Sequence, residues 1–119
     1  MNIYSEVILD HYRYPRNFGR IKNPSKKSVL FNPSCGDRIE LDALFEKDKV
    51  KEIKFRAQGC AISQASASIL TVQATGKLKE DLKKIDKDFM IKLLGIELGP
   101  NRIRCALLPL EALFKLITS

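Results

Sequence analysis

Residues 38–57 read RIELDALFEKDKVKEIKFRA. Polar and apolar residues alternate along residues 38–46 and again along 50–57, and the charged residues 47–49 separate the two runs. Alternation with a period of two is typical of a strand that buries one face. The stretch therefore predicts an antiparallel hairpin, with its apolar residues facing a core and its charged residues facing away from it.

Helical and strand patterns precede this hairpin. Residues 4–13 place apolar residues on one helical face, Ser5 is suited to cap that helix, and Pro15 stops it. A loop rich in Pro, Gly and Asn follows, and residues 28–32 predict a short strand. The N-terminal part thus contributes one helix and a third strand.

The pattern becomes helical after the hairpin. Residues 61–75 contain no Gly or Pro and are rich in Ala and Ser, which predicts a closely packed helix that Gly76 ends. Residues 81–94 predict one or two short helices, and Gly95, Gly99 and Pro100 mark a loop.

A last helix is indicated by apolar residues at helical spacing between Ile103 and Ile117. An interior proline costs a helix about 3 kcal/mol, so we expect Pro109 in the first turn and the helix start close to Cys105. The order of elements predicts one α+β domain, residues 1–119, in which helices pack on one face of a small three-stranded antiparallel sheet.

Composition narrows the class of protein. The chain has 119 residues, of which 45% are hydrophobic and 29% charged, and it contains no Trp. These values are typical of a soluble globular domain and exclude disordered and fibrous proteins. The sequence has no apolar run of about 20 residues and no signal-peptide pattern at its start, so we expect no membrane span and a cytoplasmic location.

The chain is basic, with 21 Lys and Arg against 14 Asp and Glu and a net charge of +7. The excess of positive charge is divided almost evenly between the three thirds of the sequence. Aromatic residues make up only 8%, and no RNA-recognition motif is present. We therefore expect a solvated basic surface and no nucleic-acid partner.

Three cysteines, Cys35, Cys60 and Cys105, lie at the ends of predicted elements. An odd number of cysteines excludes a complete disulfide framework, and no CxxC motif is present. In a reducing cytoplasm such residues are thiols or metal ligands. We expect Cys60 and Cys105 at helix N-termini, where the helix dipole favours the thiolate, and Arg104 favours it in the same way.

Asp37 follows Cys35 by two residues and adds a carboxylate to these thiols. Three sulfur atoms and one oxygen complete a four-coordinate zinc site or the ligand set of a two-iron cluster. Two other interpretations stay open at this point, namely three unrelated buried cysteines and a carboxylate that only caps its own turn. His11, the single histidine, is expected to pack rather than to bind metal.

The sequence resembles the U-type iron–sulfur cluster assembly proteins, which comprise IscU, SufU and the N-terminal domain of NifU. The motifs that carry the resemblance, in chain order, are YSE with DHY and PRNFG (residues 4–19), NPSCGD (32–37), GCAIS with ASAS (59–68) and IRC (103–105). The resemblance implies helices packed on a three-stranded antiparallel sheet, with Cys35, Asp37, Cys60 and Cys105 converging at one end.

The resemblance also implies a function. The chain would act as a scaffold rather than as a conventional enzyme, accepting persulfide sulfur from a cysteine desulfurase and assembling a transient [2Fe–2S] cluster from iron for apo iron–sulfur acceptor proteins. The same four residues would bind zinc when no cluster is present. Cys105 is expected to accept the sulfur, with Arg104 beside it.

Two departures from the IscU pattern distinguish this chain. Arg104 stands where IscU-like members carry a His, as in SufU, and a guanidinium cation cannot bind metal. Residues 98–102 read LGPNR and keep little of the IscU motif for a dedicated Hsp70-type chaperone, which puts that partner in doubt. The chain also lacks room for the insertion that SufU members usually carry before the last Cys. The alternative function is a zinc-dependent sulfurtransferase that serves a SufS-like cysteine desulfurase.

Overall fold

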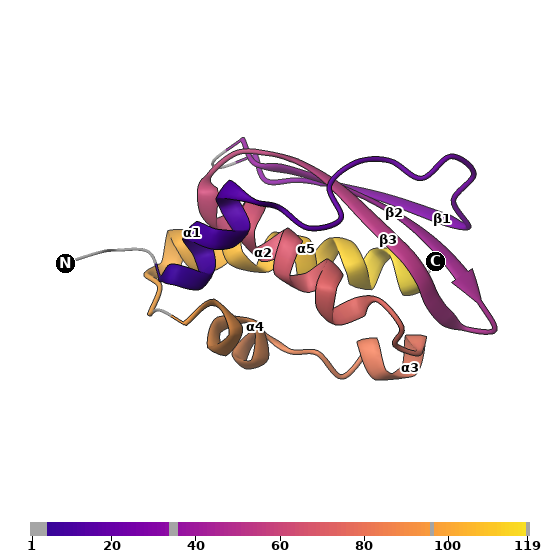
Figure 1. Ribbon diagram of the computed structural model, residues 1–119. Coiled ribbons are helices and arrows are strands. Elements are labelled where there is room, and N and C mark those ends of the chain that lie inside the picture. The colour runs from indigo at the N-terminus through magenta and orange to yellow at the C-terminus, as the bar shows by residue number, and fades with distance from the viewer. Residues whose placement is uncertain (1–4, 34–35, 96, 119) are drawn as a thin grey trace.

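A computed structural model describes residues 5–33, 36–95 and 97–118 (Figure 1). Within these residues, no helix is long and apolar enough to cross a membrane. The elements in chain order are α1 (Glu6–Arg13), β1 (Lys26–Phe31), β2 (Arg38–Glu46), β3 (Lys49–Gln58), α2 (Ala61–Ala74), α3 (Lys79–Leu82), α4 (Lys87–Leu94) and α5 (Pro100–Thr118).

The predicted hairpin is confirmed, and β1 pairs with its first strand, so that the antiparallel sheet has the order β1-β2-β3. Leu41 lies opposite Phe55, and both side chains are buried in the core. Glu40 lies opposite Arg56 on the other face, because side chains alternate along a strand. The strand predicted at residues 28–32 occupies Lys26–Phe31 instead.

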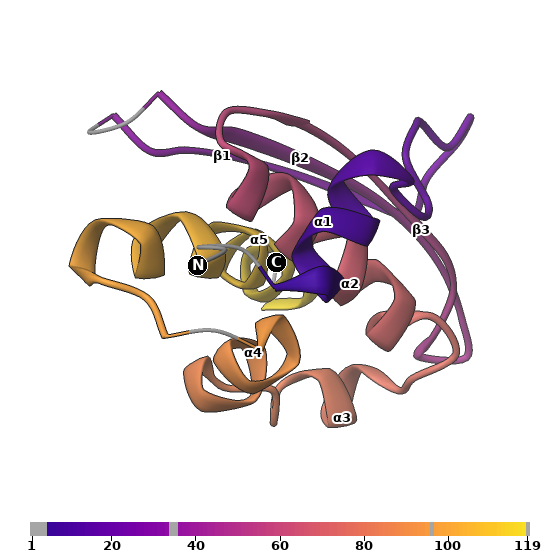
Figure 2. The same ribbon diagram turned by 60° about the vertical axis from the view of Figure 1, so that its left-hand side comes forward.

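Helix α2 is the central element of the molecule. It packs against α1, α5, β3 and α4, and together with α5 it lies between the sheet and α4 (Figure 2). Half of its fourteen residues are Ala or Ser, and ten of the fourteen are buried. Small side chains allow this close approach, as the sequence predicted.

Helix α5 begins at Pro100, five residues earlier than expected, and Pro109 lies in its interior. Both expectations about this helix are therefore wrong. Pro100 suits the first helical position, since its missing N–H has no intrahelical partner there in any case. Pro109 is tolerated because Leu108 and Leu110 beside it are buried against the sheet and α2, and this packing outweighs the intrinsic cost of the proline.

A buried side-chain hydrogen bond from α2 reaches α5 close to Pro109. Pro109 has no N–H to donate to the carbonyl of Cys105, four residues earlier. The hydroxyl of Ser66, which is fully buried, donates to the carbonyl of Ala106 at 2.6 Å. This bond fixes the first turns of α5 against α2.

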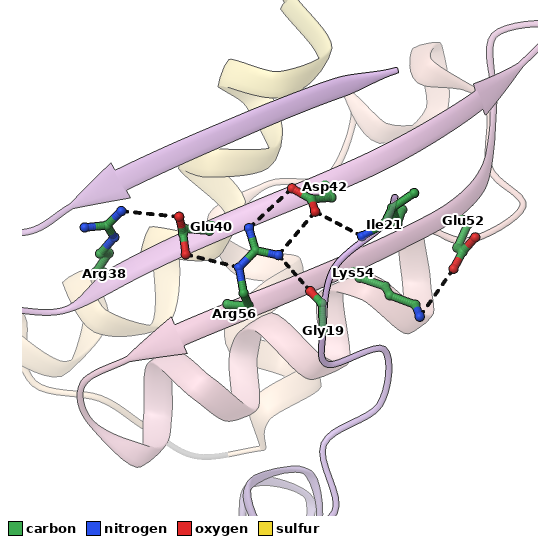
Figure 3. Close-up of polar contacts among 8 residues, drawn as sticks. All are labelled: Gly19, Ile21, Arg38, Glu40, Asp42, Glu52, Lys54 and Arg56. Atoms are coloured by element: carbon green, nitrogen blue, oxygen red, sulfur yellow. Dashed lines mark hydrogen bonds and ion pairs between the residues drawn. The ribbon is translucent and has the colours of Figure 1, made fainter. Parts of the chain in front are cut away.

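The segment between α1 and β1 crosses the edge of β3. The backbone N–H of Phe55 donates to the carbonyl of Asn17, and Gly19 N donates to the carbonyl of Phe55, both at 2.9 Å. On the sheet face opposite α2, Arg56 donates to Gly19 O at 2.9 Å and to Asp42 Oδ2 at 3.2 Å (Figure 3). The segment is therefore held to the sheet by backbone and side-chain bonds.

Candidate metal and sulfur site

Three segments that are distant in the sequence meet at one end of the sheet: the turn between β1 and β2, the junction of β3 with α2, and the beginning of α5 (Figure 1). They bring together Asp37, Cys60 and Cys105, and one potential ligand atom from each lies within 4.8 Å of the others. Cys35, the fourth expected ligand, lies outside the described residues. The structure thus brings together three of the four residues that were predicted to converge.

Asp37 links the β1–β2 turn to the start of α2. Its carboxylate is 2% exposed; Oδ1 accepts a hydrogen bond from Cys60 N at 3.1 Å and Oδ2 accepts one from Cys60 Sγ at 3.5 Å. The turn itself is closed by backbone bonds from Asn32 N to Asp37 O and from Gly36 N to Asn32 O, both 2.8 Å. The Asp37 side chain therefore joins its own turn to the residue that precedes α2.

Gly59 makes room for this carboxylate. Its φ of +136° is rarely adopted by residues with a side chain, and a Cβ built on it would lie 2.0 Å from Asp37 Oδ1 and 3.0 Å from Asp37 Cα. Real Cβ atoms do not approach other atoms that closely. Gly59 is thus a requirement of the site that the sequence analysis did not identify, because its contact is with a residue far away in the chain.

Cys60 is the N-cap residue of α2, as its position before residues 61–75 predicted. Its thiol lies 3.7 Å from the hydroxyl of Ser63, and that hydroxyl donates to Cys60 O at 3.1 Å. The residue is partly exposed, unlike Cys105, which is buried.

Cys105 differs from the expectation. It lies in the second turn of α5 and is 8% exposed, so it does not open the helix. Burial, followed by hydrogen bonding and charge repulsion from Asp37 and Cys60, raises the pKa of the Cys105 thiol. The expectation that a helix terminus favours its thiolate is therefore wrong.

Arg104 is exposed and borders a shallow surface hollow together with Phe31, Asn32 and Pro33. It lies beside the turn that leads toward Cys35 in the sequence. Its expected effect on the Cys105 thiol stays a prediction.

The donor set fits a tetrahedral metal. Ligand atoms about 2.0–2.3 Å from a tetrahedral zinc lie about 3.3–3.8 Å apart, so the three atoms need move by only about 1 Å. A carboxylate and two cysteine sulfurs carry up to three negative charges close together, and a cation would offset their mutual repulsion. The residues present therefore fit zinc or iron.

His11 has a structural role that the sequence also predicted. Its Nδ1 lies 2.7 Å from the hydroxyl of Ser68, which ties α1 to α2. Burial and the nearby Arg16 cation lower the pKa of His11, although Asp10 acts in the opposite direction.

Comparisons with known proteins agree with this geometry. The model of the NifU-like N terminal domain matches residues 3–119. The chain is 39% identical to the zinc-dependent sulfurtransferase SufU of Bacillus subtilis (strain 168), over 95% of this chain and 88% of that protein. That alignment spans 130 positions, more than the 119 residues of the chain, so the Bacillus protein carries residues that this chain lacks.

Two further relatives confirm the fold and the family. The chain is 33% identical to the iron–sulfur cluster assembly scaffold protein IscU 1 of Archaeoglobus fulgidus, over 97% of this chain and 74% of that protein. The crystal structure of an iron–sulfur cluster assembly scaffold protein for the SUF system, FiSufU from Fervidobacterium islandicum AW-1, superimposes with a TM-score of 0.84 at 34% identity, covering 97% of this chain and 96% of that one. The chain that gathers Asp37, Cys60 and Cys105 at one end of its sheet therefore belongs to the NifU-like N-terminal domain family.

Proposed function

We propose that this protein is an iron–sulfur cluster assembly scaffold, which accepts sulfur from a cysteine desulfurase and assembles a [2Fe–2S] cluster for apo iron–sulfur acceptor proteins. The observation that carries the proposal is the convergence of Asp37, Cys60 and Cys105 within 4.8 Å at one end of the sheet. The scaffold functions of its relatives support it. Reducing conditions in the cytoplasm would keep these thiols available.

Each residue has a proposed role. Cys35, Cys60 and Cys105 supply sulfur ligands, Asp37 supplies one oxygen, and iron and the cluster are the substrate and product. Cys105 is proposed to accept sulfur: its thiol gives up its proton as its sulfur bonds to the outer sulfur of the desulfurase persulfide, the S–S bond to the desulfurase cysteine breaks, and that cysteine takes up a proton and leaves as a thiol. The exchange requires no added oxidant or reductant.

A second candidate function is that of a zinc-dependent sulfurtransferase that serves a SufS-like desulfurase. It is favoured by Arg104, which stands where IscU-like proteins carry a His, and by the identity to the Bacillus SufU. The ligands would be the same four residues, with zinc as the resident metal instead of a nascent cluster.

The deciding experiment is metal and labile-sulfide analysis of protein purified without oxygen, followed by sulfur loading with cysteine and a cysteine desulfurase. We expect iron and sulfide in a cluster that passes to an apo-acceptor. Stable zinc that stimulates the desulfurase, without cluster transfer, would favour the sulfurtransferase instead. Absence of both metal and sulfur uptake would refute both functions, and Cys105→Ser should abolish sulfur loading if the proposed acceptor is correct.

Asp37→Ala tests the role of the oxygen ligand. An oxygen ligand is held less tightly by iron than a thiolate and is the ligand expected to leave first, so its removal should slow the transfer of the cluster to an apo-acceptor. Transfer is followed by the visible circular dichroism of the acceptor. Asp81→Ala, which removes an exposed carboxylate far from the site, is the control and should transfer at the parent rate. Equal or faster transfer from the Asp37 variant would contradict the role.

A further inference from the structure

The 26 residues between Asp10 and Asp37 contain no acidic residue. They contain six Arg and Lys residues. This local excess of positive charge is not visible when net charge is summed over thirds of the chain. Within this part of the chain, residues 12–22 read YRYPRNFGRIK and interleave aromatic rings with cations. We refer to residues 12–22 as the tyrosine–arginine segment.

The rings of this segment point into solvent. Tyr14 is 70% exposed and Phe18 is 55% exposed, and Tyr12 is exposed as well. Only Phe18 has an aromatic neighbour among the described residues, an edge-to-face contact with Phe55 at 5.4 Å between ring centroids. Large exposed rings beside arginines are typical of protein interfaces, where Tyr, Trp and Arg supply most of the binding energy.

Charge pairing leaves the cations of the segment in excess. The nearby carboxylates are all engaged: Asp10 pairs with Arg16, and Glu40 and Asp42 pair with Arg56. Arg13, Arg20 and Lys22 are exposed and form no ion pair with any residue that the structure describes. The segment therefore presents three exposed cations that are available to carboxylates of another molecule.

The segment is rigid although most of it is not in a helix or strand. Arg16 N donates to the hydroxyl of Ser68 at 2.9 Å, and Asn17 Nδ2 donates to Thr71 Oγ1 at 3.2 Å, so α2 holds its middle. Ile21 N donates to Asp42 Oδ2 at 3.0 Å, which fixes its far end on the sheet (Figure 3). A surface that is already ordered loses little conformational entropy when it binds.

The segment also reaches toward the candidate metal site. A surface hollow on the open face of the sheet is lined by Phe18 and Arg20 on one side and by Arg38 and Gln58 on the other. Arg38 follows Asp37, and Gln58 precedes Gly59 and Cys60 in the chain. A partner bound along the hollow would therefore lie beside the site without occupying it.

From these observations we infer that the tyrosine–arginine segment is a docking surface for a protein that presents Asp and Glu carboxylates. We favour a protein over a nucleic acid because the sequence has no RNA-recognition motif and only 8% aromatic residues. The inference does not depend on the sulfur and cluster chemistry proposed above, since none of Asp37, Cys60 and Cys105 belongs to the surface.

The test is a titration with a short, fluorescently labelled peptide that is rich in Glu and Asp and contains two Leu residues. Binding is measured by fluorescence anisotropy. The parent protein should bind the peptide, and binding should weaken as salt rises from about 50 to about 200 mM. The triple variant Arg13→Glu, Arg20→Glu and Lys22→Glu should bind at least about tenfold more weakly. Tyr14→Ser should weaken binding by about threefold or more, because its ring is lost as a contact.

The matched control is Lys83→Glu, Lys87→Glu and Lys92→Glu, which makes the same change of charge at exposed positions around α3 and α4. We expect its affinity to stay within about twofold of the parent value, because these positions lie outside the proposed surface. Equal loss in both triple variants would overturn the inference, since the binding would then follow net charge alone.

Two other results would also overturn it. One is that the parent protein does not bind the peptide. The other is that a labelled thymidine oligonucleotide binds more tightly than the peptide and is lost in the Arg13, Arg20 and Lys22 variant, which would assign the surface to nucleic acid. Zinc binding by each variant is measured in parallel and should be unchanged, so that a failure of the docking surface is distinguished from a failure of the metal site.

Discussion

Gly59 shows how the candidate site depends on a residue that has no side chain. Its backbone lies against the Asp37 carboxylate, and no other residue type leaves the space that Asp37 Oδ1 occupies. The same carboxylate bonds to Cys60 N. The position of the Asp37 carboxylate therefore depends on the absence of a Cβ at Gly59, the residue before Cys60.

Gly59→Ala should weaken zinc binding by about 10- to 100-fold, because the new methyl group displaces Asp37 from the site. Affinity is measured by competition with a chromophoric chelator. Gly76→Ala is the matched control: Gly76 also has a positive φ, +84°, but a Cβ there would meet nothing within 4 Å. That variant should lose about 1–2 kcal/mol of stability and keep its zinc affinity. Equal affinities for all three proteins would refute the steric role of Gly59.

The residues of the site were predictable where their signal was local. Cys60 and Asp37 stand out by residue type and by position at the end of an element. The requirement for Gly59 was not predictable, because it arises from a contact with Asp37, which is distant in the sequence. The raised pKa of Cys105 was not predictable either, because it arises first from burial and then from the nearby Asp37 and Cys60. Burial is a property of the fold and has no signature in the residues next to Cys105.

At the scale of elements, the sequence pattern predicted the hairpin correctly but placed the start of α5 too late. Alternation along residues 38–57 fixes which face of the hairpin is buried, and the register confirms it. For α5, the intrinsic cost of Pro109 predicted a later start, but buried apolar residues on both sides of the proline hold the helix together. The stabilisation that tertiary packing gives to a helix cannot be predicted from the periodicity of the sequence.

Ser66→Ala should lower the free energy of unfolding by about 1–3 kcal/mol, because it removes the buried donor to the Ala106 carbonyl near Pro109. The free energy is measured by urea denaturation. Thr75→Ala, which removes an exposed hydroxyl bonded only to the preceding turn of its own helix, should change it by less than about 0.5 kcal/mol. A loss in Ser66→Ala as small as that of the control would show that the Ala106 carbonyl does not need its donor.

At the scale of the whole molecule, a charged network on the open sheet face joins the segment after α1 to the sheet. Arg56 bonds to Glu40, Asp42 and the carbonyl of Gly19. Burial alone would raise the pKa of Asp42, but hydrogen bonds from Arg56 and Ile21 N and the charge of Arg56 outweigh it, so that the pKa is lowered. The network therefore contributes stability only while Asp42 is ionised.

The stability of the protein should consequently fall in acid. Because the pKa of Asp42 is lower in the folded state than its ordinary value of 3.8, the unfolded chain binds more protons, and the contribution is complete above that value and lost below it. In urea denaturation from pH 7 to pH 3, Asp42→Asn should be less stable at pH 7 and lose less stability on acidification. Asp48→Asn, at an exposed turn, should keep the parent dependence on pH. Parallel curves for the parent and Asp42→Asn would contradict this account.

The order of the segments that build the candidate site has a consequence for protein synthesis. Asp37 and Cys60 leave the ribosome before Cys105, which is carried by α5, and α5 packs on α2 and β1, both already made. A nascent chain therefore offers an incomplete set of donors for most of its synthesis. Iron or zinc can be bound by the full set only after α5 has folded against the rest, so the fold itself delays loading until translation has passed that helix.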